Sequence, residues 1–414
     1  MLAEQILRIF SGVFVGIYIA RFLGPEQFGV LSYVLAVSGF AIAVARLGME
    51  VILVRELVNS PKKESELMGT SFWLMTVSAI VCYTILAAII VAFEESDEVK
   101  KYALIVATST FFTSFLSIDY LYQSKLKAKY STVCKVFALL IMSLAKLGLI
   151  YFQAGLFWFV IASVLDHAIL ALFLLLAITR TTKLDFFKKF NKKLAFSMLR
   201  SALPLVLAAL AGMILMRIDQ IMIRNALDLH QVGIYSAAVR VYEAWIVLPY
   251  ILTVSLLPAI VKLKQGDRVN YHKRLVQLFQ LVIWISIFTA VIVTTYSDEI
   301  ILTAFGESYA DAGPVLSIVM WTAVFSAVGA LSSRYYNVEH MERKILFRIA
   351  VAAALNIALN FILIPKYGIT GPAYSTLFCM FFTTYVMDWF DKDLKVLLSI
   401  KHRALFPLTI KKKK

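Results

Sequence analysis

The stretch GMILMRIDQIMIRNALDLHQVGIYSAAVRVYEAW, residues 212–245, decides how the rest of the chain is interpreted. Apolar runs lie on both sides of a short polar segment, Asn225–Gln231, which predicts two membrane helices joined by a turn. Ionisable residues are costly in lipid and normally face a cavity, a partner helix or water. The stretch therefore marks a candidate functional site, because its apolar runs contain Arg217, Asp219, Arg224, Arg240 and Glu243.

The composition predicts a membrane protein with many spans. Of the 414 residues, 61% are hydrophobic and 16% are charged, and the mean hydropathy is +0.81. Soluble domains are about 45–50% apolar and about 25% charged. The formal net charge is +15. We attribute this charge to loops on one side of the membrane, so no nucleic-acid partner is predicted.

Each membrane helix needs about 20 mostly apolar residues. Counting such runs predicts about twelve spans, so the expected fold class is an all-α polytopic membrane protein. The spans are roughly 2–22, 29–54, 68–93, 101–122, 131–153, 156–179, 202–224, 232–261, 274–296, 312–335, 345–365 and 370–390.

Basic residues alternate with acidic residues from one loop to the next. Lysines and arginines gather after spans two, four, six, eight and ten and in the C-terminal tail, which includes Lys401. The other loops carry acids such as Glu94 and Asp298. Because basic loops stay in the cytoplasm, we predict that both termini and the loop Arg180–Arg200 are cytoplasmic.

The chain also repeats itself. The segment RFLGPEQFGV from Arg21 returns as RNALDLHQVGI from Arg224, and later matches keep a similar offset. An even number of spans separates the copies, which predicts two six-helix lobes of like orientation, residues 1–190 and 191–414. Parallel repeats of this kind place a transport site between the lobes.

Spans seven and eight carry the main candidates. At about 100° per residue, Arg217 and Gln220 share a face and Asp219 lies about 200° away from Arg217. Arg240 and Glu243 share a face of span eight. In one interpretation Asp219 or Glu243 forms a structural ion pair with these arginines. In the other, Arg217 lines a cavity.

Charged residues also lie in the first lobe. Arg46 and Glu50 stand four residues apart in span two and are expected to pair, and Arg8 lies at a comparable depth in span one. In spans five and six, Lys146 and Asp166 form an expected structural ion pair. The functional alternative is ion coupling through Asp166 and His167, because histidine titrates near neutral pH.

No catalytic signature accompanies these residues. The sequence has no phosphate loop, no HExxH, no CxxC and no nucleophile elbow. No predicted loop is large enough for a catalytic domain outside the membrane. We therefore expect a protein that is not an enzyme.

Several motifs resemble those of the Wzx-type polysaccharide flippases, a family within the multidrug/oligosaccharidyl-lipid/polysaccharide exporter (MOP) superfamily. The resemblance covers nearly the whole chain. It rests on ARFLGPEQFGVLSY at 20–33, Leu47-Gly48 followed by Val54-Arg55-Glu56-Leu57, RIDQIM at 217–222, VGIYSAA at 232–238, and Phe305-Gly306 with Tyr309, Ala312 and Gly313.

The resemblance implies a two-lobed bundle around a central cavity. It implies that an undecaprenyl-pyrophosphate-linked oligosaccharide, an O-antigen or related polysaccharide unit, moves from the cytoplasmic to the periplasmic leaflet of the bacterial inner membrane. The implied partners are this cargo, membrane lipids, the polysaccharide polymerase and the chain-length regulator; no cofactor is implied.

A pyrophosphate in bare hydrocarbon would cost on the order of tens of kcal/mol. Arginine suits this cargo, since its planar fork binds phosphate oxygens in pairs and keeps its charge. The predicted substrate-binding residues are Arg217, Arg46, Arg8, Gln220 and Arg240. The rival function is a cation-coupled drug or small-molecule antiporter of the same superfamily, whose cationic cargo would call for an acidic cavity.

Overall fold

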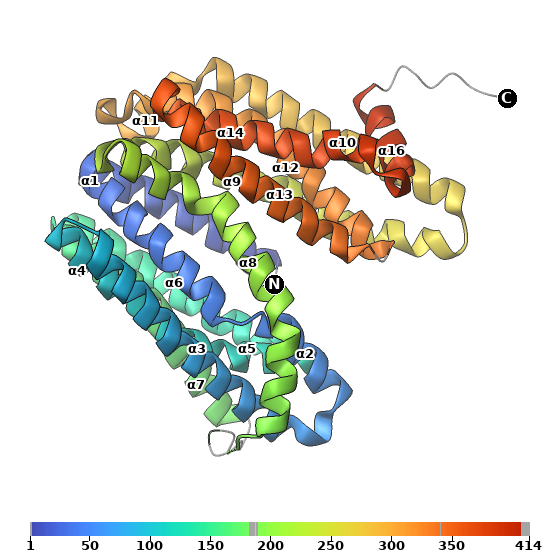
Figure 1. The fold of residues 1–414 in the computed structure, drawn as a ribbon, viewed down its shortest axis with the longest axis horizontal. Coiled ribbons are helices and arrows are strands. Elements are labelled where there is room, and N and C mark those ends of the chain that lie inside the picture. Colours follow the sequence, from blue (N-terminus) through green and yellow to red (C-terminus); the bar gives the residue numbers. More distant parts are fainter. Residues whose placement is uncertain (1, 182–186, 188, 340, 407–414) are drawn as a thin grey trace. The chain divides into compact units, whose positions relative to one another are not determined.

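A computed structural model describes residues 2–181, 187, 189–339 and 341–406. The regular elements in this part of the chain are all helical (Figure 1). Contacts divide the chain into two compact units, Met1–Ile221 and Met222–Lys414. This division runs through a helix, whereas the predicted lobe boundary at residues 190–191 rests on the repeat and stays a prediction.

The first unit contains seven α-helices and most of an eighth. The helices are α1 (Leu2–Ala45), α2 (Met49–Asn59), α3 (Glu64–Phe93), α4 (Asp97–Ala107), α5 (Leu116–Ser124), α6 (Ala128–Tyr151), α7 (Leu156–Thr181) and α8 (Lys192–Ala226), with 3₁₀ segments at Pro61–Lys63 and Thr108–Phe115.

The second unit begins at Met222, within the last turns of α8. It contains α9 (Leu229–Lys262), α10 (Arg268–Thr295), α11 (Ser297–Phe305), α12 (Ala312–Val338), α13 (Glu342–Tyr367), α14 (Thr370–Phe381), α15 (Met387–Phe390) and α16 (Lys395–Leu405). The 3₁₀ segments are Leu263–Gln265, Glu307–Tyr309 and Lys392–Leu394, and a π-helical segment, Phe382–Val386, joins α14 to α15.

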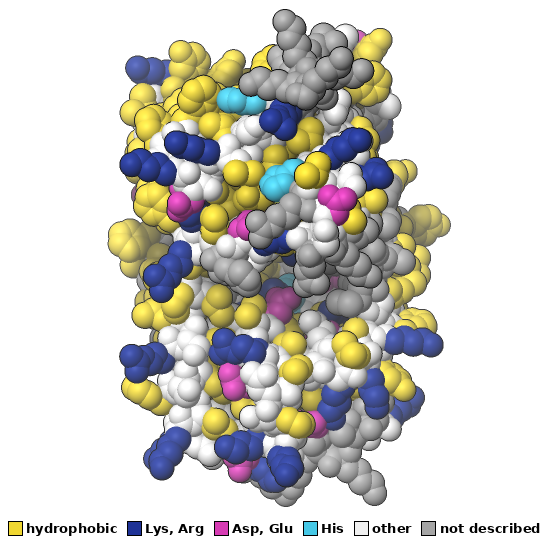
Figure 2. Space-filling view, turned by 90° about the vertical axis from the view of Figure 1, so that its right-hand side faces the viewer, with side chains coloured by type: hydrophobic (Ala, Val, Ile, Leu, Met, Phe, Trp, Pro, Cys, Tyr) yellow, Lys and Arg dark blue, Asp and Glu magenta, His cyan; other side chains and the backbone are white. Residues whose placement is uncertain are grey.

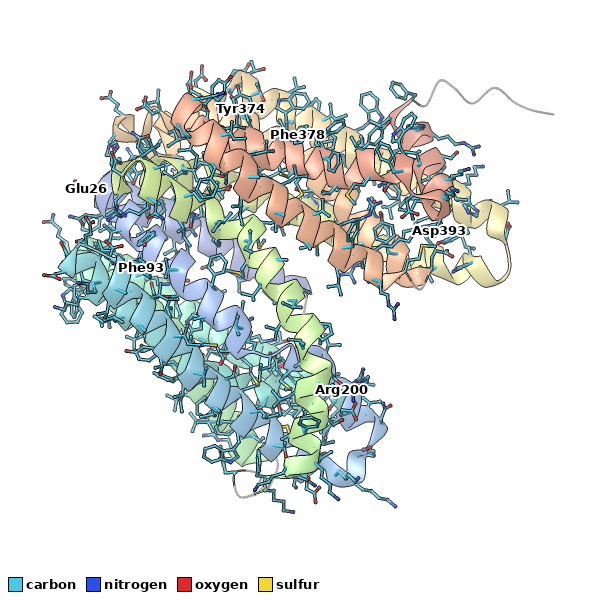
Figure 3. The ribbon with its side chains drawn as sticks, in the orientation of Figure 1. Glu26, Phe93, Arg200, Tyr374, Phe378 and Asp393 are labelled. Carbon is cyan, nitrogen blue, oxygen red and sulfur yellow. The ribbon has the colours of Figure 1, made fainter. Side chains whose placement is uncertain are left out.

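The predicted polytopic helical fold is confirmed. Nine helices among the described residues are long and apolar enough to cross a membrane. One of these stretches, Ser11–Asn59, contains two predicted spans because α1 bends at Gly24, where φ is 72° and Pro25 follows. The two blue arms of α1 separate at this bend, near the Glu26 label of Figure 3. Helix α9 and the stretch from α14 to α15 cover the predicted spans 232–261 and 370–390, so helices of the described part of the chain lie at all twelve predicted spans.

The internal repeat appears in the backbone as well. An offset of about 204 residues matches Gly24 with Asp228, and both positions break the helical path. Gly24 does so through its positive φ, which glycine tolerates. Asp228 instead caps α9, accepting a hydrogen bond at 2.8 Å from the backbone N–H of Gln231. Different local chemistry thus makes the same turn in both halves.

Span two is shorter than predicted. The helix ends at Ala45, and Leu47 and Gly48 have φ values of 50° and 61° before α2 begins. A Cβ on Gly48 would lie 2.5 Å from Cβ of Leu205 in α8. The absence of a side chain at Gly48 therefore permits both the left-handed turn and the close approach of α8.

Span four is not one regular helix. The predicted span 101–122 contains eight residues of 3₁₀ helix, Thr108–Phe115. Hydroxyl side chains bond to carbonyls three residues earlier, as Thr110 does to Ala107 O at 2.8 Å and Thr113 to Thr110 O at 2.7 Å. Such local bonds compete with regular helix geometry.

The predicted loop Arg180–Arg200 is also shorter, because α8 begins at Lys192 and Pro204 lies inside that helix. Asn191 Oδ1 accepts hydrogen bonds from the backbone N–H groups of Lys193 and Leu194. Among the basic residues of this segment, Lys183 and Lys188 lie outside the described residues.

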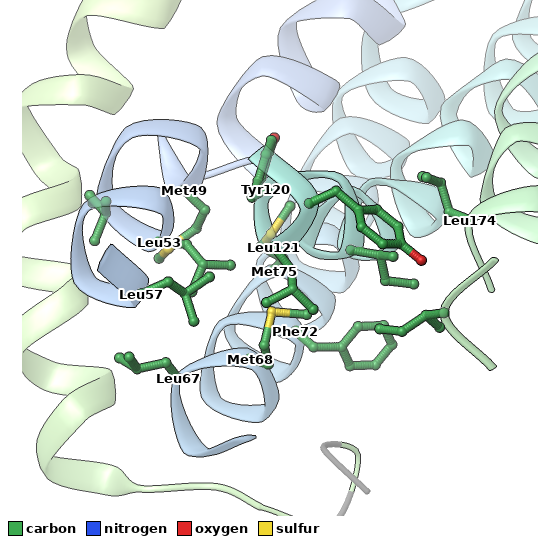
Figure 4. Close-up of a cluster of buried hydrophobic side chains, with 14 of the residues drawn as sticks. Met49, Leu53, Leu57, Leu67, Met68, Phe72, Met75, Tyr120, Leu121 and Leu174 are labelled. Atoms are coloured by element: carbon green, nitrogen blue, oxygen red, sulfur yellow. The ribbon is translucent and has the colours of Figure 1, made fainter. Parts of the chain in front are cut away.

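Each unit has its own apolar core. In the first, Met49 and Leu53 of α2 meet Phe72 of α3, Leu121 of α5 and Leu174 of α7 (Figure 4). In the second, residues of α10, α12 and α16 pack together. Helix α16 was expected to be part of a basic tail. Its residues Leu397, Ile400 and Ala404 are instead buried on one face, which packs the helix against the core.

Labelled residues mark the two ends of the first unit, and basic side chains are prominent on the surface. In the first unit, Glu26 and Phe93 label one end and Arg200 lies toward the other (Figure 3). Figure 2 shows a face on which dark blue lysine and arginine side chains predominate over magenta acids. This agrees with the formal net charge of +15.

Candidate functional site

Helix α8 holds three of the predicted site residues. Asp219 and Gln220 are 5% and 3% exposed, and Arg217 is partly exposed. Arg240 and Glu243 are partly buried on α9. Each of these five side chains has at least one interaction partner. Their assignment to substrate binding or to structural ion pairs therefore remains a proposal.

Arg46 and Glu50 do not have the predicted helical arrangement. Arg46 lies in the turn between α1 and α2, Glu50 lies in the first turn of α2, and both are exposed. The left-handed residues Leu47 and Gly48 separate them, so they are not on successive turns of one helix. The side chain of Arg8 lies outside the described residues.

The structure brings together charged residues from three predicted spans. Lys146 Nζ lies 2.5 Å from Asp166 Oδ2, and the Asp166 side chain is 37% exposed. His167 Nδ1 lies 3.2 Å from the carbonyl oxygen of Ser163, which fits donation by an Nδ1–H. The charges of Lys146, Asp166 and Arg46 all act on the His167 ring. Arg46 is therefore part of the same polar region as the predicted coupling pair.

A second ion pair in the first unit was not predicted. Asp119 of α5 is 4% exposed, and its Oδ2 accepts hydrogen bonds from Lys135 Nζ at 2.7 Å and Gln123 Nε2 at 3.0 Å. The sequence did carry a sign of this residue, because Asp119 is an acid inside the predicted span 101–122, and ionisable residues within spans often have a function.

A third cluster lies in the second unit. Asp388 is 1% exposed and contacts two cations, Arg348 Nη1 at 2.7 Å through Oδ1 and Lys401 Nζ at 2.6 Å through Oδ2. The same cations bond to carbonyls of the π-helical segment, Arg348 to Thr383 O and Lys401 to Thr384 O, both at 2.6 Å. π-Helical segments disturb regular backbone pairing and often mark functional regions.

The second unit also has an apolar groove of about 590 Å³ between α12, α13 and α14. Its aromatic rings are partly ordered by neighbours: Trp321 Nε1 donates to Thr294 Oγ1 at 3.1 Å, and Phe325 meets Phe381 edge-on at 5.3 Å. Such a surface accepts hydrocarbon rather than a charged or sugar group. The lining residues are Trp321, Phe325, Leu359, Leu363, Tyr374, Leu377, Phe378 and Phe381.

Metal chemistry has no support in the described residues, where no three His, Cys, Asp or Glu side chains are grouped as ligands. The chemistry available at the polar clusters is the binding of charge: guanidinium and ammonium groups for anions, and carboxylates for a proton or a cation.

Solved structures identify the fold. A multidrug resistance MATE family transporter of the MOP superfamily, in an inward-facing conformation, is similar with a TM-score of 0.75 at 15% identity, covering 95% of this chain and 96% of that one. The lipid II flippase MurJ, inward closed, is similar with a TM-score of 0.75 at 15% identity, covering 97% and 90%. The expected MOP superfamily resemblance is confirmed, and the chain is a multi-pass membrane protein.

The sequence comparisons agree. A probable flippase, AglR of Haloferax volcanii, is 23% identical over 386 residues, covering 91% of this chain and 79% of that protein. The family model described as "Polysaccharide biosynthesis protein" matches residues 18–314. Because this match spans well over half of the sequence, the chain belongs to the polysaccharide biosynthesis protein family.

Proposed function

We propose that the protein is a flippase that moves a polyprenyl-pyrophosphate-linked oligosaccharide from the cytoplasmic to the outer leaflet by alternating access. The observation that carries this proposal is the match to a polysaccharide biosynthesis family in a chain with a transporter fold. Two similar proteins that are named flippases, one found by sequence and one by structure, support it. The carrier we propose is undecaprenyl, and the cargo is an O-antigen or related repeat unit.

Arginines inside the membrane supply the chemistry that this cargo needs. The dianionic head loses its hydration on leaving water, and fixed guanidinium groups replace that hydration with paired hydrogen bonds. We assign this role to Arg217, Gln220 and Arg240, and to Arg46 and Arg8 in the first half. Asp219, Glu243 and Glu50 are assigned to structural ion pairs with these arginines, and Lys146 is assigned to a structural ion pair with Asp166.

Transport against a gradient requires an energy source. We assign ion coupling to Asp166 and His167, since they lie in one polar region with Lys146 and Arg46. The protein is placed in the bacterial inner membrane with cytoplasmic termini, because basic loops favour that side. The polymerase and the chain-length regulator, which would receive the flipped units, are the proposed protein partners.

The second candidate is a cation-coupled drug antiporter, favoured by the equal fold similarity to a multidrug transporter. One experiment separates the two. Purified protein is reconstituted in liposomes with a fluorescent polyprenyl-pyrophosphate oligosaccharide, and an impermeant quencher reports the fraction in the outer leaflet. Protein-dependent loss of the protected fraction supports the flippase. Efflux of cationic dyes from the same liposomes, with no movement of the lipid, would support the antiporter instead.

A further inference from the structure

The ion pair between Asp119 and Lys135 has an incomplete set of hydrogen bonds. Asp119 Oδ2 accepts from both Lys135 Nζ and Gln123 Nε2. Asp119 Oδ1 is shut off from solvent and has no hydrogen-bond partner among the described residues. Buried carboxylate oxygens normally have hydrogen-bond partners. One oxygen of this carboxylate is thus available to a small cation.

Lys135 is the mobile partner of the pair. Its side chain is 24% exposed, whereas that of Asp119 is 5% exposed. The ammonium group sits on a flexible stem and can turn away from the carboxylate. Asp119 has no such freedom because α5 packs against α2, α3, α6 and α7.

Among the described residues, few other ionisable groups face this carboxylate. From α6 these are Lys135 and the neighbouring thiol of Cys134, on which the Asp119 charge acts. From the α1–α2 turn and α2, the charges of Arg46 and Glu50 reach the adjacent phenol of Tyr120. At the start of α3, Glu64 forms an ion pair with Lys125.

On α7, the nearest ionisable side chains within the span are engaged elsewhere. Asp166 contacts Lys146, and His167 contacts the Ser163 carbonyl. Lys135 is accordingly the cation bonded to Asp119, and its departure would leave the carboxylate to a replacement cation.

We propose that Asp119 is a further site for the coupling cation, beside the proposed pair of Asp166 and His167, and that it binds a proton or Na⁺ in exchange for the ammonium group of Lys135. In the proton case, an O–H bond forms at Asp119, the ion pair breaks and Lys135 keeps its three protons. The pair changes from neutral to a charge of +1 on Lys135, which can then attract the anionic head of the cargo. The inference rests on the proposed function only in naming this cargo.

The surrounding backbone suits a site that moves. The 3₁₀ segment Thr108–Phe115 leads directly into α5, and mid-helix 3₁₀ segments often mark hinges. Helix α2, which packs against α5, follows the left-handed turn at Leu47 and Gly48. Exchange of cations at Asp119 would therefore act on two irregular segments of the first unit.

Asp166 provides a matched comparison. Helix α6 supplies the lysine in both pairs, Lys135 for Asp119 and Lys146 for Asp166. The Asp166 side chain is 37% exposed, whereas that of Asp119 is 5% exposed. The two carboxylates differ chiefly in burial, and separate variants show whether Asp119, Asp166 or both take the cation.

Infrared difference spectroscopy on detergent-purified protein tests the site without transport. Spectra at high and low pH, with and without NaCl, are compared for wild type, D119N and D166N. We expect a protonated-carboxyl band at low pH, or a carboxylate band shifted by NaCl, that is lost in D119N and kept in D166N. Suppression of the protonated band by NaCl identifies Na⁺ as a competitor; no effect identifies the proton alone. A signal unchanged in D119N, or none in wild type, overturns the proposal.

The double variant D119N/K135M guards against misfolding, since it removes both charges and strands neither. In the liposome assay we expect cargo movement that no longer responds to an imposed pH or Na⁺ gradient. A gradient response equal to wild type would contradict the inference. If wild type moves no lipid-linked oligosaccharide, the proposed function fails, while the infrared result still decides whether Asp119 binds the cation.

Discussion

Lys401 Nζ lies 2.6 Å from Asp388 Oδ2, and both side chains are almost completely buried, at 0% and 1% exposed. Arg348 contacts the other oxygen of the same carboxylate. One anion therefore balances two cations at the junction of the last predicted span and α16. Since Lys401 and Arg348 also bond to carbonyls of the π-helical segment, the cluster ties α13, the π-helical segment and α16 together.

Removing the anion should cost more than removing one cation. D388N leaves Arg348 and Lys401 buried without a carboxylate, and we expect a loss of about 3–5 kcal/mol in stability. K401M keeps the Arg348–Asp388 pair and should lose less. Thermal unfolding of the purified variants in detergent shows which substitution lowers the stability more. Equal losses, or a larger loss for K401M, would show that Asp388 is not the centre of the cluster.

The same lysine predicts a pH dependence. Burial lowers the pKa of Lys401 from its usual 10.5 to about 8, against the opposing effect of Asp388. Between these values the unfolded chain binds a proton that the folded chain does not, so stability rises with pH across this window. The free energy of unfolding of wild type minus that of K401M should increase from pH 8 to pH 10, by roughly 2–3 kcal/mol, and the difference in melting temperature should increase with it. A constant difference would mean that Lys401 keeps its proton.

Glycine 48 should be intolerant of a side chain. Its φ is 61°, and an added Cβ would lie 2.5 Å from Leu205 Cβ. We expect G48A to lose about 2–4 kcal/mol from the left-handed backbone and the clash together. G148A in α6 is the control, because nothing lies within 4 Å of the added atom. Similar unfolding temperatures for the two variants would contradict the close packing of α8 on the α1–α2 turn.

Hydropathy identified the spans because a membrane helix must be long and apolar, so most residues of each span are hydrophobic. The turn at Gly48 and the 3₁₀ segment at Thr108–Phe115 do not change the hydropathy pattern, since they depend on backbone angles and side-chain hydrogen bonds. Helix α11 is too short and too close to a turn to stand out. Local backbone chemistry therefore accounts for most of the errors in the fold.

The candidate site was predicted in part. Charges deep in apolar runs, such as Lys146 and Asp166, were found because they are conspicuous there. Asp119 and Asp388 lie in the last turn of predicted spans, and Lys401 lies in the predicted basic tail, where burial cannot be judged from sequence. Their partners come from other helices, and only the packed structure joins them.

Topology can be checked with single cysteines. Lys189 and Glu95 are both exposed, and the basic-loop pattern places them on opposite sides of the membrane. In intact cells, an impermeant maleimide should label E95C and fail to label K189C until the membrane is permeabilised. The background is a variant without Cys82, Cys134 and Cys379. Labelling of K189C in intact cells would reverse the proposed orientation.

The role of Arg217 depends on whether its charge serves the cargo or the fold. If it binds pyrophosphate, R217A should abolish surface polysaccharide while membrane abundance stays normal. R217K should retain partial display, since an ammonium group still attracts phosphate without the paired geometry. Polysaccharide display and membrane abundance are measured together for each variant.

A structural ion pair predicts a different pattern for the same residue. R217A would then strand Asp219 or Glu243 and lower membrane abundance, and a second change, D219N or E243Q, would restore both abundance and display. For a substrate contact, neither second change restores display, because the guanidinium group that meets the cargo is still missing. Rescue in a double variant, or normal display in R217A alone, would remove Arg217 from the proposed substrate site.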